Sequence, residues 1–164
     1  MFVFHFELPT NVSNGEDNQI PPTSGEMYIE TENGYFPCIG WSDRLLPVVM
    51  QWIGNAIHIL DAASGEQHVP HYFMDGPYSF DLQITERDNV TIQFMRHSWE
   101  GENREEMPFQ TLALVDYSKA LFDLTGKLIN DPNFHWFGRE KERDALRQSL
   151  PLLKAAMKRR QIDV

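Results

Sequence analysis

Residues 27–39 read MYIETENGYFPCI, and this stretch predicts a β-hairpin. One strand-forming run, residues 27–31, comes before Glu32-Asn33-Gly34, and a second, residues 35–39, comes after it. Asn-Gly between two such runs is a strong hairpin signal, because both residues readily adopt the positive φ angles of a tight turn. Antiparallel pairing is therefore expected near the start of the chain.

Alternating apolar and polar residues predict further strands on both sides of this hairpin. The N-terminal stretch 2–6, FVFHF, alternates as a half-buried strand requires, and it lacks the basic start of a secretory signal. Residues 72–95 predict a meander of antiparallel strands with turns at 75–77 and 86–89, and one face of this sheet should be solvated. Residues 109–115 form either another strand or the start of a helix.

Two helices are predicted where apolar residues recur at helical spacing. Ser42 or Asp43 can cap the first, and Asp116 or Ser118 can cap the second, which ends before Asp131-Pro132. The apolar stripes are Leu45, Val48, Val49, Trp52, Ile53, Ala56 and Leu60 in the first helix, and Tyr117, Ala120, Leu121, Leu124 and Leu128 in the second.

A third helix is predicted from about residue 139 towards residue 160, with Leu146, Leu150, Leu153 and Met157 on its inner stripe. Pro151 should kink it or divide it in two, with Ser149 able to cap the second half. These elements predict an α+β fold, in which about three helices pack mainly on one face of an antiparallel sheet. With 164 residues, of which 41% are hydrophobic, we expect one globular domain over 1–164, with a flexible polar loop at 9–26.

Charge is distributed unevenly along the chain. Residues 1–136 contain twenty Asp and Glu against six Lys and Arg, whereas residues 137–164 contain four against eight, and the net charge is −10. An acidic body suits the capture of a basic protein surface and is poorly matched to nucleic-acid phosphates. No segment approaches membrane-spanning length, so neither nucleic acid nor membrane is predicted as a partner.

Signals for catalysis are weak. The sequence has no phosphate loop, dinucleotide turn, nucleophile elbow or paired-Cys zinc site. Residues three apart in a strand point to opposite faces, so His68 and His71 would meet near Asp75 only if the chain turned at Pro70. The lone Cys38 forms no internal disulfide, which favours a reducing cytosol, and its apolar neighbours predict a buried, inert thiol. No catalytic residue, metal or cofactor is therefore predicted.

The stretch from Trp99 to Glu106 predicts a loop in which a large apolar side chain stands among glutamates. Such a composition is typical of a protein-binding hot spot with a polar rim, although Trp99 could equally fold back over the sheet. The predicted partner-binding residues are Trp99, Glu100, Glu102, Glu105 and Glu106, with Asp75 and Glu86 nearby.

The basic end of the chain has a structural interpretation. Lys154, Lys158, Arg159 and Arg160 gather near a predicted helix end. Cations favour helix C-termini, and they can also pair with the acidic body of the same chain. Without exposed aromatic residues between them, they are weak evidence for nucleic-acid binding.

The Tyr28 to Trp41 hairpin, the Trp52 helix, the turn Phe73 to Tyr78 and the two closing helices give the chain an organisation that resembles small bacterial immunity proteins of polymorphic or contact-dependent toxin systems. The resemblance concerns size, acidity and α+β layout. It implies a cytoplasmic protein without catalytic residues that binds a cognate toxin domain with a basic surface, often a nuclease. Two alternatives remain open: a small hydrolase or metal-dependent enzyme using carboxylates or His68 and His71, and a structural or adaptor protein.

Overall fold

The computed structural model describes residues 2–8, 24–62, 68–86, 89–97, 104–106, 108–132, 134, 136 and 139–162, with backbone alone for 86 and 104–106. Its strands are β1 (Phe2–Glu7), β2 (Ser24–Thr31), β3 (Gly34–Phe36), β4 (Ser42–Arg44), β5 (His68–Tyr72), β6 (Tyr78–Glu86), β7 (Asn89–His97), β8 (Arg104–Glu106) and β9 (Gln110–Ala113). Its helices are α1 (Leu45–Asp61), α2 (Leu114–Asn130) and α3 (Glu140–Arg159). The predicted α+β class is confirmed.

The strands divide between two antiparallel sheets instead of forming a single sheet. In sheet A, β2 lies between β1 on one side and both β3 and β4 on the other. In sheet B the order is β5-β6-β7, and β8 and β9 both pair with β7. The predicted hairpin is confirmed as β2 and β3, with Thr31 opposite Gly34. The predicted meander is confirmed as β5, β6 and β7.

Three predicted boundaries move because of strand pairing. The loop expected at 9–26 overlaps β2, since residues 24–26 pair with β4, and residues 9–23 lie outside the described ranges. The first strand of the meander begins at His68 instead of Tyr72. Both alternatives for residues 109–115 occur in turn, because β9 ends at Ala113 and α2 begins at the next residue.

Neither predicted side-chain cap is found at α1 or α2. Each helix follows a strand directly, so the preceding residues, Arg44 and Ala113, are extended and held in the ladders of β4 and β9. Asp43 lies within β4, and Ser118 lies inside α2, where its hydroxyl donates to the Leu114 carbonyl at 2.7 Å. The ladder thus defines both helix starts, and a polar cap is not used.

Helix α3 is continuous through Pro151. The Ser149 hydroxyl donates to the Leu146 carbonyl at 2.6 Å, so Ser149 does not cap a second helix as predicted. Proline removes one backbone donor, yet Leu146 and Leu153 on either side are fully buried. Packing of the apolar stripe therefore keeps the two halves together.

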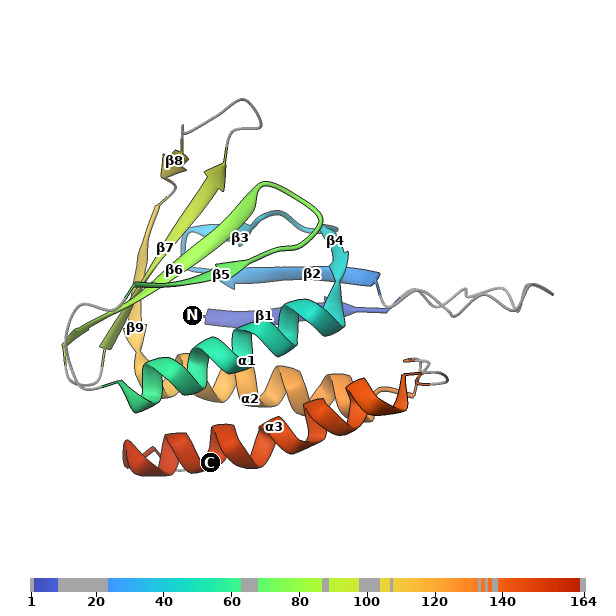
Figure 1. The fold of residues 1–164 in the computed structure, drawn as a ribbon. Coiled ribbons are helices and arrows are strands. Elements are labelled where there is room, and N and C mark those ends of the chain that lie inside the picture. Colours follow the sequence, from blue (N-terminus) through green and yellow to red (C-terminus); the bar gives the residue numbers. More distant parts are fainter. Residues whose placement is uncertain are drawn as a thin grey trace.

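The molecule has its sheets on one side and its helices on the other (Figure 1). Helices α1 and α2 lie beneath the strands, and α3 packs against α1 and α2 on the side away from the sheets. Buried apolar side chains from both sheets and all three helices form one continuous cluster. Trp52 of α1 is fully buried at its centre, as predicted. In the described ranges, no helix combines the length and apolarity needed to cross a membrane.

Two arginines of the basic C-terminal region bind the end of α1. Arg159 pairs with both carboxylate oxygens of Asp61, at 2.6 and 2.8 Å, and the Arg160 guanidinium donates to the carbonyls of Leu60 and Ala62. Cations at the C-terminus of a helix complement its dipole and its free carbonyl groups. For these two residues the structural interpretation is confirmed.

Candidate functional site

The predicted acidic loop lies largely beyond the described residues. Trp99, Glu100 and Glu102 fall outside them, and of Glu105 and Glu106 only the backbone is described. This backbone is strand β8, in which Glu105 lies opposite Arg96 and Glu106 lies opposite Met95 of β7. The last three residues of the expected loop therefore extend sheet B.

Asp75 and Glu86 lie at opposite ends of sheet B. Asp75 belongs to the turn before β6, and this turn meets the end of β7, where the His97 amide donates to the Pro77 carbonyl at 2.6 Å. The same end of β7 pairs with β8, so Asp75 lies at the β8 end of the sheet. Glu86 ends β6, roughly 25 Å away along an extended strand, so it does not lie near this end.

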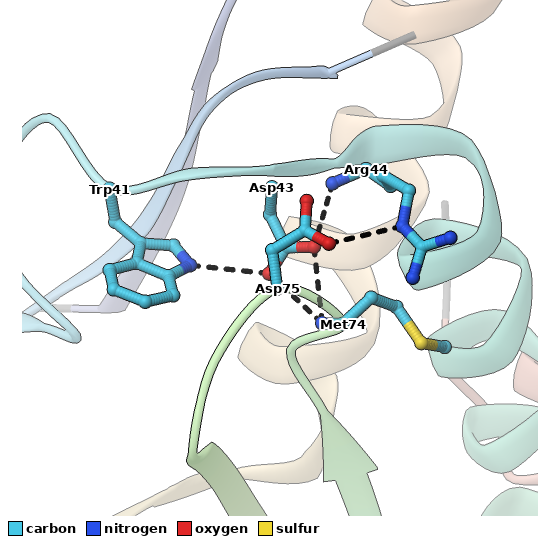
Figure 2. Close-up of polar contacts among 5 residues, drawn as sticks. All are labelled: Trp41, Asp43, Arg44, Met74 and Asp75. Carbon is cyan, nitrogen blue, oxygen red and sulfur yellow. Dashed lines mark hydrogen bonds and ion pairs between the residues drawn. The ribbon is translucent and has the colours of Figure 1, made fainter.

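Asp43 joins the two sheets (Figure 2). This side chain is fully buried, and its carboxylate accepts hydrogen bonds from the Trp41 indole at 3.2 Å, the Arg44 amide at 2.6 Å and the Met74 amide at 3.0 Å. Next to it, the Arg44 guanidinium pairs with Asp75 at 3.1 Å. Asp43 is thus a structural clamp between β4 and the 73–77 turn, and Asp75 is already engaged by a cation of its own chain.

The Trp41 ring completes this clamp. It lies edge to face with Tyr78, with ring centroids 4.9 Å apart, and covers Gly76 so closely that a Cβ there would lie 2.4 Å from the indole. Glycine is therefore required at position 76 by the indole of Trp41, which comes from another part of the chain.

His68 and His71 point to opposite sides of β5, as the spacing predicts. His68 is exposed and His71 is fully buried. The His71 Nδ1 lies 3.0 Å from the Val69 carbonyl, and its Nε2 lies 2.9 Å from the Tyr117 hydroxyl. A carbonyl can only accept, so Nδ1 carries the proton, and Nε2 accepts from Tyr117.

The surroundings of this pair keep both groups neutral. The His71 ring stacks on Phe80, with centroids 4.6 Å apart, and lies beside Trp52. Burial lowers the pKa of His71 to about 3 and raises the pKa of the Tyr117 phenol. Enclosed in the core, the pair connects β5 to α2.

The prediction for Cys38 is wrong: the side chain is exposed. Strand β3 ends at Phe36, because Pro37 has no N–H to continue the ladder. The chain then turns outward, with the Trp41 amide donating to the Cys38 carbonyl at 3.2 Å, and Ile39 is 61% exposed.

As for metal binding, within the described ranges no group of three His, Cys, Asp or Glu side chains could hold an ion.

The outer face of sheet A carries the most distinctive surface among the described side chains. We call it the Tyr–Glu face, and it consists of His5, Glu7, Glu26, Tyr28, Glu30 and Tyr35. Strand alternation places these residues on one side of β1, β2 and β3, opposite the buried Phe4, Met27 and Ile29. The face therefore combines three aromatic rings with three carboxylates.

The rings of the Tyr–Glu face are held in a fixed arrangement. His5 stacks on Tyr28 at 4.8 Å with an interplanar angle of 14°, and Tyr35 meets Tyr28 edge to face at 5.7 Å. His5 Nε2 lies 2.8 Å from a Glu30 oxygen. These contacts position the aromatic surface before any partner arrives, which reduces the entropy lost on binding.

Two of the carboxylates, Glu7 and Glu26, lie together at one end of the same face. Glu7 and Glu26 are exposed and directly opposite each other on β1 and β2. Like charges in this position repel, so they favour a cation from elsewhere. Arg44 at the β4 end is engaged by Asp75. Alternation in residues 24–31 predicts that Glu26, Tyr28 and Glu30 share a face, but the register was needed to place β1 and β3 beside them.

Comparison of the chain with protein-family models, with curated proteins and with solved structures found no match.

Proposed function

We propose that this chain is a non-enzymatic inhibitor that binds a basic protein domain, and that it acts as an immunity protein against a cognate toxin domain such as a nuclease. The observation that carries the proposal is the Tyr–Glu face. Protein-binding hot spots are enriched in tyrosine at the centre and surrounded by polar groups that exclude water. A rim of glutamates specifies a partner rich in Lys and Arg.

Charge over the rest of the chain supports a basic partner. The first 136 residues carry fourteen more acidic than basic residues. Among the described arginines that are engaged within the molecule, Arg44 pairs with Asp75, Arg159 pairs with Asp61, and Arg160 binds the last carbonyls of α1. A net acidic field speeds the encounter with a basic domain, and fast capture is what an inhibitor of a toxin needs.

The loop from Trp99 to Glu106 remains part of this proposal as a second contact region. Its last residues form β8, at the same end of sheet B as Asp75. The Tyr–Glu face supplies the described aromatic and acidic surface, and Trp99 would supply a further aromatic anchor. Glu86, at the other end of β6, is the member of the predicted set with the least support.

The proposal predicts that a toxin gene lies directly upstream, and the test is protection against, and binding to, the basic domain that this gene would encode. Cells expressing that domain should grow when the parent chain is co-expressed. The double variant Glu7→Lys/Glu26→Lys should protect poorly and associate about tenfold more slowly at low salt, with a weaker dependence on salt. The matched control Glu142→Lys/Asp144→Lys makes the same change of charge on α3 and should behave like the parent.

Two outcomes would contradict the proposal. If no basic domain binds the parent chain, the inhibitor function is wrong. If a basic domain binds and both double variants weaken it equally, general charge is responsible and the Tyr–Glu face is not the site. Circular dichroism of each variant checks that the fold is retained.

A further inference from the structure

The free edge of β1 opens onto a groove. The groove has a volume of about 530 Å³ and lies between β1, β9 and α2. Phe2, Val3 and Phe4 line one wall and residues 110–112 line the other, while Ala120 and Leu124 of α2 belong to the floor. Among the described residues, β2 is the only strand that pairs with β1, so the other edge of β1 faces this groove.

An unpaired strand edge presents backbone N–H and C=O groups that another strand can use. The chain protects the comparable edge of sheet B. Beside β5, the Asn55 amide donates to the Pro70 carbonyl at 2.7 Å, the Tyr72 amide donates to Gln51 at 2.9 Å, and the Trp52 indole donates to the Tyr72 carbonyl at 3.1 Å. Beside β1, by contrast, the structure has the groove. The edge of β5 is therefore covered by side chains of α1, whereas the edge of β1 borders a hollow.

We propose that an extended segment of the basic partner adds as a strand to the free edge of β1 and occupies this groove. The identity of the partner rests on the proposed function. Side chains of an added strand alternate between the two faces. Those that point inward meet the apolar floor, as Phe4 does when it packs 6.1 Å from Tyr117. Those that point outward lie beside His5 and Glu7 on the Tyr–Glu face.

Charge decides the chemistry of the outward side chains. Glu7 lies on β1 beyond the groove-lining Phe2, Val3 and Phe4 and is flanked by Glu26 on the β2 side. A Lys or Arg of an added strand that continues along β1 to Glu7 would relieve the repulsion. The groove itself is lined by the carboxylates Glu32, Asp116 and Asp123 and by Lys119 and Lys127. A segment of alternating apolar and basic residues fits both faces, and one strand then connects the groove to the Tyr–Glu face.

The test uses a synthetic peptide, acetyl-Lys-Val-Lys-Val-Lys-Val-Lys-amide, and a second peptide of the same sequence N-methylated at alternate residues. The ¹⁵N-labelled chain is titrated with each. The first peptide should shift the amide signals of residues 2–7 and of the groove face of α2. The affinity of the second peptide should be lower by about tenfold or more, because this peptide cannot form the strand hydrogen bonds.

Ala120→Tyr fills the floor of the groove and should weaken the binding of the first peptide by about the same factor as N-methylation does. Ala155→Tyr, at an exposed position of α3, is the matched control and should have no effect. Equal affinity for both peptides, absence of binding, or signal shifts confined to Tyr28 and Tyr35 would overturn strand addition. These outcomes leave the proposed function intact if a basic domain still binds through Glu7 and Glu26. Groove binding without any basic partner supports strand addition and contradicts the proposed function.

Discussion

Replacement of the buried His71–Tyr117 pair should change how stability depends on pH. The pKa of His71 is about 3 in the folded chain and about 6.5 in the unfolded chain. The unfolded state therefore binds one more proton between these values. The contribution of neutral, buried His71 to the stability of the fold is fully present above pH 6.5 and is lost progressively as the pH falls towards 3.

The magnitude follows from the number of protons. Each pH unit below 6.5 favours unfolding by up to tenfold, so at pH 5 His71 alone destabilises the fold by about 2 kcal/mol. The double variant His71→Phe/Tyr117→Phe removes both polar partners together and retains ring packing against Phe80. Replacement of both partners by apolar groups costs little in itself, whereas Tyr117→Phe alone leaves the buried Nε2 without a donor.

The assay is urea unfolding of the parent chain and the double variant from pH 8 to pH 5. The difference in free energy of unfolding should be constant above pH 7.5 and move by about 2 kcal/mol in favour of the variant by pH 5. Surface histidines and carboxylates cancel in this difference. Parallel stability curves would refute the reasoning, because they would show that His71 does not take up a proton on unfolding in this range.

Three further predictions concern single side chains. Asp43→Ala should lower the free energy of unfolding by about 3 kcal/mol in urea, since three part-buried donors lose the fully buried carboxylate that accepts from them; a loss below about 1 kcal/mol would contradict the clamp. Gly76→Ala should destabilise by about 1–3 kcal/mol through contact with Trp41, whereas Gly54→Ala, in open space on α1, should stabilise by about 0.5–1 kcal/mol; a thermal melt that shifts both in the same direction would exclude this explanation. Trp99→Ala should raise the dissociation rate of the partner and cost about 2 kcal/mol of affinity, and unchanged binding would remove Trp99 from the site.

Local periodicity was sufficient to predict much of the secondary structure. The hairpin of β2 and β3, the alternation of β6, and the apolar stripes of α1 and α2 each depend on residues a few positions apart. For the same reason, the opposite directions of His68 and His71 were predictable from their spacing alone.

The tertiary structure decided which segments lie beside each other. The division of the strands into two sheets, the burial of Asp43 and the pairing of His71 with Tyr117 each join residues far apart in the sequence, and no local pattern encodes such partners. The Tyr–Glu face has the same origin: His5, Tyr28 and Tyr35 come from three strands. Composition could show that the chain is acidic, but only strand register could gather its carboxylates around these rings, because register determines which side chains share a surface.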